Sequence, residues 1–90
     1  MTKIKMFSLT EYVRTALSSA VYERDENGII IARVPGAPGF YSQGKTFEEA
    51  RENLKDAIEG NITLALQLNL PIPELDAIQI KEQDVPAHAA

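Results

Sequence analysis

The feature that most constrains the fold is an Asn27-Gly28 dipeptide between two runs of β-favouring residues. Residues 19–24 lose the helical spacing that precedes them, and residues 29–34 are β-branched and almost continuously apolar. Asn-Gly readily adopts the positive φ angles of a tight hairpin, so the two runs are predicted to pair as antiparallel strands. The apolar character of residues 29–34 predicts a strand that is central in its sheet or covered on both faces.

A segment rich in proline and glycine follows this hairpin. Residues 35–39 hold two prolines, which cannot donate to a β ladder, and two glycines, which tolerate positive φ. This segment should end the second strand. A short third strand is expected at residues 40–43, before Gly44.

Two capping boxes predict two helices. Ser8, with Glu11 three residues later, begins a short helix over residues 9–17, and Thr46 with Glu49 begins a long helix that runs to about residue 68. Asn69 is the expected left-handed cap at the end of the long helix. The buried stripe of the long helix is expected to contain Phe47, Ala50, Leu54, Ala57, Ile58, Ile62 and Ala65.

The end of the chain is expected to add one more strand. Residues 77–81 alternate between apolar and polar types, as a half-buried strand does, and residues 82–90 are expected to form a flexible tail. The predicted fold class is α+β, in the order α-β-β-β-α-β: a small, mostly antiparallel sheet of three or four strands packed on one long helix. It is a single domain over residues 1–81.

Charge is divided unevenly along the chain. Residues 1–45 carry six Lys or Arg and four acids, whereas residues 46–90 carry three bases and nine acids. An acidic half repels nucleic acid and attracts basic proteins, although such acids can also serve only as a solvated face. Arg51 and Lys55 are placed to pair with acids one turn away on the long helix. The candidate partner-binding residues are the acids on one side of this helix: Glu48, Glu52, Asp56 and Glu59.

The last two turns of the long helix are apolar well beyond one stripe. A helix end that is apolar on several sides is usually covered by a second chain or by a returning segment. We therefore expect self-association, as a dimer or tetramer, through Leu64, Leu66, Leu68 and Leu70.

The residues needed for most catalytic sites are missing. The chain has no cysteine, and its one histidine, His88, lies in the expected tail, so no catalytic residue, cofactor or metal site is predicted. Asp25 and Glu48 are better explained as turn and helix-end acids than as ligands of Mg²⁺. Residues 39–46 match the P-loop pattern, but they are expected to form a strand, and 90 residues leave no room for a nucleotide-binding sheet.

Nucleic-acid and membrane functions are also disfavoured. The bases of the first half do not form a run interleaved with exposed aromatic residues, and no helix pair for DNA binding is evident. No apolar run reaches the roughly 18 residues that a membrane span needs, and no signal peptide is recognisable. A cytoplasmic location is expected.

The order of these motifs resembles the HicB-like antitoxin family over residues 20–75. The matching pieces are Tyr22, Asn27-Gly28, Ala32-x-Val34-Pro35, Pro38-Gly39, Ser42-Gln43-Gly44, Thr46-x-Glu48-Glu49-Ala50, Asn53-Leu54-x-x-Ala57-Ile58 and Pro71-x-Pro73-Glu74. The resemblance implies a fold similar to a truncated ribonuclease H or double-stranded-RNA-binding domain. It also implies a non-enzymatic protein that neutralises HicA, a small basic mRNA-cleaving toxin, by protein–protein contact.

Many members of that family carry a C-terminal DNA-binding domain as well. Only 16 residues follow Glu74, so this chain looks like the short, stand-alone branch, without that domain. The alternative is an orphan homo-oligomer with no toxin partner. A weak Mg²⁺-dependent nuclease is suggested only by analogy of fold, which is poor support for an activity.

Overall fold

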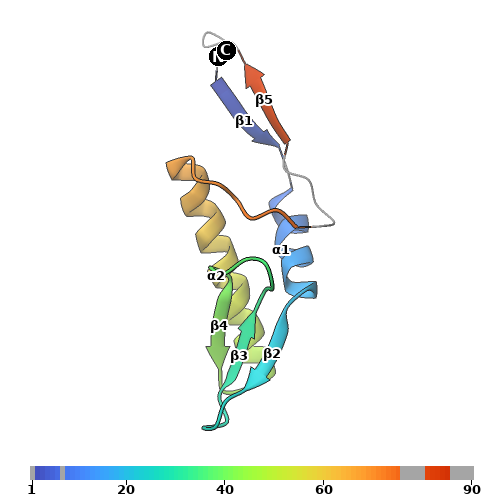
Figure 1. The fold of residues 1–90 in the computed structure, drawn as a ribbon, viewed down its shortest axis with the longest axis vertical. Helices are drawn as coiled ribbons and strands as arrows, with labels where there is room; N and C mark the ends of the chain where they lie inside the picture. Colours follow the sequence, from blue (N-terminus) through green and yellow to red (C-terminus); the bar gives the residue numbers. More distant parts are fainter. Residues whose placement is uncertain (1, 7, 76–80, 86–90) are drawn as a thin grey trace.

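The computed structural model describes residues 2–6, 8–75 and 81–85. Two helices and five strands follow one another along the chain (Figure 1). Their order and bounds are β1 (Thr2–Met6), α1 (Leu9–Ser18), β2 (Val21–Arg24), β3 (Ile30–Arg33), β4 (Tyr41–Gly44), α2 (Phe47–Leu68) and β5 (Lys81–Val85).

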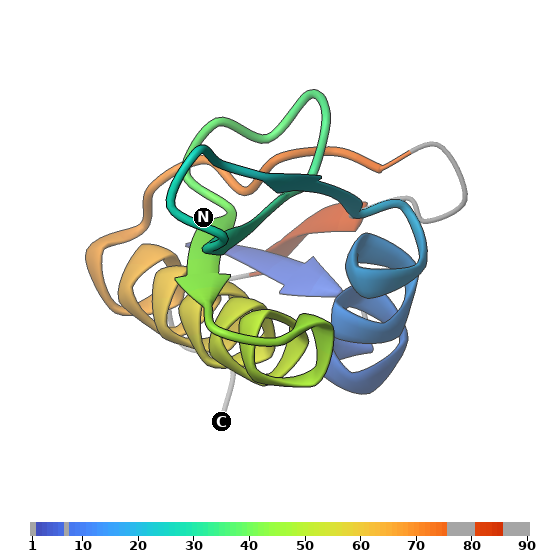
Figure 2. The ribbon, with the colours of Figure 1, turned by 90° about the horizontal axis from the view of Figure 1, so that it is seen from below.

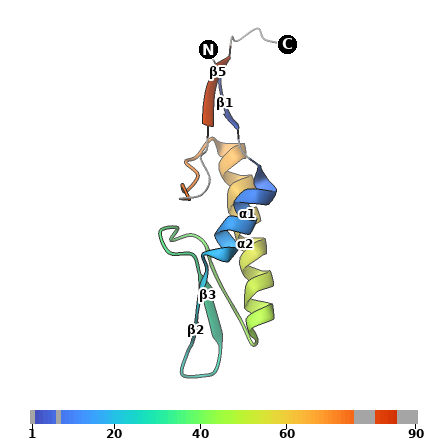
Figure 3. The same ribbon diagram turned by 90° about the vertical axis from the view of Figure 1, so that its right-hand side faces the viewer.

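The body of the molecule has two layers. β2, β3 and β4 form an antiparallel sheet with β3 in the centre, and the register aligns Tyr22, Ala32 and Ser42 across the three strands. Figures 2 and 3 show α2 along one face of this sheet and α1 beside α2. β3 is therefore central, as expected, but it is covered on one face only: Ile30 and Ala32 are buried, whereas Arg33 is exposed.

The β2–β3 hairpin forms at the predicted place, with Asp25 organising the turn. One oxygen of its carboxylate, Oδ1, accepts hydrogen bonds from the amides of Asn27 and Ile29, each at 2.8 Å. Gly28 has a φ of 82°, while Asn27 keeps a negative φ. Because a two-residue type I′ turn needs positive φ at both central positions, the connection is a longer turn that depends on Gly28 alone.

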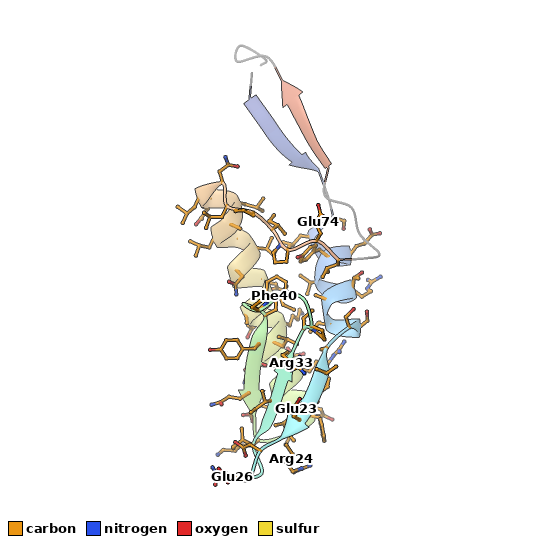
Figure 4. All side chains as sticks on the ribbon, viewed as in Figure 1. Glu23, Arg24, Glu26, Arg33, Phe40 and Glu74 are labelled. Atoms are coloured by element: carbon orange, nitrogen blue, oxygen red, sulfur yellow. The ribbon has the colours of Figure 1, made fainter. Side chains whose placement is uncertain are left out.

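The core lies between the two layers and joins α1 to the segment that follows α2. Tyr12 is fully buried, its ring meets Phe40 edge to face at 6.2 Å between centroids, and its hydroxyl donates to the carbonyl oxygen of Pro73. Figure 4 places Phe40 between the sheet and the helices. Burial raises the pKa of Tyr12 to about 12. Ile72 is also buried, so the returning segment closes one side of the core.

Both ends of α2 follow the sequence prediction. The hydroxyl of Thr46 accepts from the amide of Glu49 at 3.0 Å, and Asn69 adopts the left-handed conformation with a φ of 53°. The start of α2 presses against Gly44 of β4, where an added Cβ would lie 2.5 Å from the amide nitrogen of Ala50. Only glycine allows this close approach of helix to strand.

One residue of the predicted buried stripe lies elsewhere. Phe47 is 53% exposed, because at the first position of α2 its ring packs beside the sheet rather than under it. It meets Tyr22 edge to face at 5.8 Å, and the guanidinium of Arg24 lies 5.8 Å from its centroid. Ala57 is half-buried, and the other five members of the stripe are buried.

The predicted order α-β-β-β-α-β was incomplete at its start, and the position of its last strand differs. A strand precedes α1, and β5 begins at Lys81, where the predicted final strand was to end; residues 76–80 lie outside the described residues. The prediction of a flexible tail was wrong for residues 82–85, because they pair with β1 in an antiparallel ladder. The single-domain boundary at residue 81 consequently cuts this ladder. Residues 86–90 are not described.

β1 and β5 form a two-stranded sheet of their own, which we call the ribbon. The register pairs Thr2 with Val85, Ile4 with Gln83 and Met6 with Lys81. Figures 1 and 3 show the ribbon beyond the C-terminal end of α2, extending the long axis of the molecule, whose extents are 55 × 22 × 18 Å.

Candidate functional site

A groove of about 560 Å³ runs between the two helices. It forms because α1 is short and buries one stripe, so its flank and that of α2 diverge toward solvent. Nine residues line it: Leu9, Thr10, Val13, Arg14, Leu17, Arg51, Glu52, Lys55 and Glu59. Its floor is apolar and its walls are charged, an arrangement that suits an amphipathic protein segment.

The charged walls of the groove are mixed in sign. Arg14, Arg51 and Lys55 face the same space as Glu52 and Glu59. Among the side chains that the structure describes, the one ion pair joins Arg33 Nη2 to Glu23 Oε1 at 3.4 Å, on two neighbouring strands (Figure 4). The pairing expected for Arg51 and Lys55 with acids one turn away is therefore not formed, and these charges remain available to a partner.

The four predicted partner-binding acids do not share one surface. Glu52 and Glu59 line the groove, where Glu59 is half-buried, whereas Glu48 and Asp56 are exposed outside it. Residues seven apart on a helix lie almost in line, which explains why Glu52 and Glu59 fall together. Arg14 was not anticipated at this surface, because it reaches the groove only through the packing of α1 on α2.

The four predicted self-association leucines surround the end of α2. Leu64, Leu66 and Leu68 are 49%, 47% and 59% exposed, and Leu70, just beyond the helix, is 45% exposed. Leu64 and Leu68 are four apart and share a flank, whereas Leu66, two residues from each, lies on another. We call these four residues the leucine end of α2.

The open face of the sheet carries a further surface that the sequence did not indicate. Tyr41 is 65% exposed and lines a hollow of about 370 Å³ together with Ile31, Arg33 and residues 34–38. Tyr41 was expected only as part of a strand. Its exposure follows from the register, which places it beside Arg33 on the face away from the helices.

Chemical sites are not prominent in the described part of the chain. No group of three or more His, Asp or Glu residues there could hold a metal ion. The segment that matches the P-loop pattern contains strand β4, which pairs with β3, and the amide of Lys45 donates to the carboxylate of Glu49 at 3.2 Å. His88 lies outside the described residues. No described helix is long and apolar enough to cross a membrane.

A three-stranded antiparallel sheet covered on one face by α2, with α1 packed on α2, defines a small α+β domain. Residues 11–73 match the model of the UPF0150-like family, and the chain belongs to this family. Two curated relatives support the assignment. A UPF0150 protein of Thermoplasma acidophilum is 37% identical over 62 residues, covering 69% of this chain and 90% of the relative, and one of Archaeoglobus fulgidus is 36% identical over 62 residues, covering 69% and 87%.

Two solved structures share the fold. The crystal structure of TTHA0281 from Thermus thermophilus matches with a TM-score of 0.73 at 27% identity, covering 90% of this chain and 98% of that one. The N-terminal domain of the antitoxin HicB from Burkholderia pseudomallei matches with a TM-score of 0.54 at 20% identity, covering 74% and 93%. The predicted HicB-like α+β fold is thereby confirmed.

Proposed function

We propose that this protein is a non-enzymatic antitoxin that neutralises a small basic HicA-like mRNA-cleaving toxin by protein–protein contact. The observation that carries the proposal is the likeness of its fold to the N-terminal domain of an antitoxin. The match covers 74% of this chain and 93% of that domain.

The charge on α2 supports a basic partner. Glu48, Glu52 and Asp56 are exposed, and none forms an ion pair among the described side chains. Unpaired surface acids raise the association rate of a cationic protein and make that rate dependent on ionic strength. The groove beside Glu52 and Glu59 offers an apolar floor against which such a partner can pack.

Co-expression tests the proposal directly. A small basic protein encoded next to this chain is expressed alone and with it, and growth and intact mRNA are measured. We expect this chain to restore both and to co-purify with its neighbour. A neighbour that is not toxic, or whose toxicity is unchanged, removes the antitoxin function.

A matched pair of charge reversals tests the surface. Glu52→Lys with Asp56→Lys is compared with Glu26→Lys and Glu74→Lys, which change the net charge equally but lie at the hairpin tip and beside α1 (Figure 4). The α2 pair should slow association at least tenfold at low salt and abolish most of its salt dependence. Equal effects of the two pairs would mean that net charge, rather than this face of α2, attracts the partner.

The second candidate is an orphan homo-oligomer without a toxin. Exposure of the leucine end of α2 favours it, because three leucines that are each about half exposed are unusual on one helix end of a monomer. Light scattering distinguishes the states: a monodisperse monomer excludes this candidate, whereas a dimer or tetramer with no effect on any neighbouring protein supports it.

A further inference from the structure

The ribbon packs against no other element of the described chain. β1 and β5 contact each other extensively, and neither makes comparable contacts with α1, α2 or the three-stranded sheet. A two-stranded antiparallel sheet is at best marginally stable in water, and three or more strands or a helix against one face are needed. The ribbon therefore needs cover that the described elements of its own chain do not provide.

The sequence of the ribbon indicates what kind of cover it needs. In β1, Lys3 and Lys5 alternate with Ile4 and Met6. Alternation of this kind is typical of a strand with one buried and one solvated face. The register sets Ile4 and Met6 opposite Gln83 and Lys81, and Thr2 opposite Val85, so the apolar residues of the ribbon come mostly from β1. We therefore expect β1 to pack on an apolar surface about as long as a five-residue strand.

The same chain exposes an apolar surface of this kind. Leu64, Leu66 and Leu68 lie on the last two turns of α2, at the end of the body from which the ribbon extends (Figure 1). Among the described residues, the contacts of the ribbon with α2 are few in comparison with those between β1 and β5. A ribbon and an exposed apolar helix end on one chain can cover each other when two copies are related by a two-fold axis, which gives a closed dimer.

We propose that two copies of this chain exchange ribbons, so that the ribbon of each copy lies over the leucine end of α2 of the other. The dimer is built from the ribbon and the end of α2, and it leaves the α1–α2 groove open. It therefore does not depend on the proposed toxin, and either proposal can fail while the other holds.

The absence of cysteine makes a crosslinking test straightforward. One chain carries Ile4→Cys and a second, lengthened by a purification tag, carries Leu68→Cys. The two are co-expressed, purified through the tag and treated with a short bis-maleimide. Exchange predicts a crosslinked product with the summed mass of the two different chains. In the matched control the tagged chain carries Glu26→Cys at the distant hairpin tip, and this product should fall at least tenfold.

A second experiment measures how substitutions in the ribbon and in the leucine end of α2 change the oligomeric state. Light scattering should give a dimer for the wild-type chain and a monomer for Leu64→Lys with Leu68→Lys, with the helical circular dichroism of the two chains equal. Ile4→Asp, in the ribbon, should have the same effect, whereas Tyr41→Lys, on the open sheet face, should leave the dimer intact. A wild-type monomer, a dimer that survives Ile4→Asp, or equal crosslinking in the control would overturn the proposal.

Discussion

Tyr12 ties α1 to the segment after α2 through one hydroxyl group. Replacing it in Tyr12→Phe keeps the ring against Phe40 but removes the hydrogen bond to the Pro73 carbonyl oxygen. The free energy of unfolding should fall by about 1 kcal/mol at neutral pH, the typical net value of one such bond. Urea unfolding followed by circular dichroism measures this loss, and an unchanged midpoint would show that the bond does not contribute.

The same residue makes stability depend on alkaline pH. Its pKa is raised from 10.0 to about 12, so the folded protein keeps the phenol proton after the unfolded chain has lost it. Stability from this group is present below pH 10 and declines as the pH rises toward 12. The difference in unfolding free energy between wild type and Tyr12→Phe should therefore shrink across that range. A constant difference would contradict the raised pKa.

Replacing glycine with alanine should change stability in opposite directions at Gly44 and at Gly60. In Gly44→Ala the new Cβ meets backbone atoms of Glu49 and Ala50, so stability should fall by about 1–3 kcal/mol. In Gly60→Ala the Cβ meets nothing within 4 Å, and alanine in the middle of α2 should raise stability by roughly 0.5–1 kcal/mol. Thermal unfolding of both variants checks the signs.

At the scale of elements, α2 protects the outer edge of β4. Asn53 donates to the Gln43 carbonyl oxygen at 2.8 Å, whereas Asn61 donates to Gly39 at 3.3 Å and to Ala57 of its own helix at 2.8 Å. Both Asn→Ala changes gain the same helix propensity, so their difference compares the 2.8 Å bond from Asn53 to β4 with the 3.3 Å bond from Asn61 to Gly39 and its bond within the helix. Asn53→Ala should be less stable than Asn61→Ala by several tenths of a kcal/mol, with faster amide exchange in β4. Equal stability and exchange would mean that Asn53 does not secure this edge.

The elements that could be predicted are those with local signals. The hydroxyl caps Ser8 and Thr46, the turn at Gly28 and the αL residue Asn69 act within a few residues, and each appears where it was expected. β1 could not be found in this way, because its partner lies more than 70 residues away and its sequence has no turn beside it. The predicted last strand at residues 77–81 shares only Lys81 with β5 for the same reason, and residues 76–80 lie outside the described part of the chain.

The candidate surfaces were predictable only in part. Helical spacing placed the acids and leucines of α2 correctly on the outside of the molecule, since that pattern depends on α2 alone. The groove depends on how α1 packs against α2, so the contribution of Arg14 was hidden. The exposure of Tyr41 likewise depends on strand register rather than on residue type. The periodicity of one helix thus predicts which side chains share a face of that helix. The packing of helices and strands decides which of these faces contact each other.

At the scale of the whole molecule, the body and the ribbon should respond differently to protein concentration. The body has its own core between the sheet and the helices. In the proposed exchanged dimer, by contrast, the ribbon and the leucine end of α2 are covered only by each other. Folding that is coupled to dimer formation is favoured by mass action, so the melting temperature of the wild-type chain should rise with concentration. The variant Leu64→Lys with Leu68→Lys should melt at one temperature over the same range.

A toxin that binds only the folded chain would also stabilise it by mass action, but through the groove rather than through the leucine end of α2. Adding the basic neighbour should raise the melting temperature of wild type and of the leucine variant alike, because the groove is intact in both. Glu52→Lys with Asp56→Lys should lose this increase yet keep its dependence on protein concentration. Differential scanning fluorimetry of the three chains, each over a concentration series and with or without the neighbour, measures both effects. Loss of both dependences in a single variant would show that the dimer and the toxin use one surface, and would refute their separation.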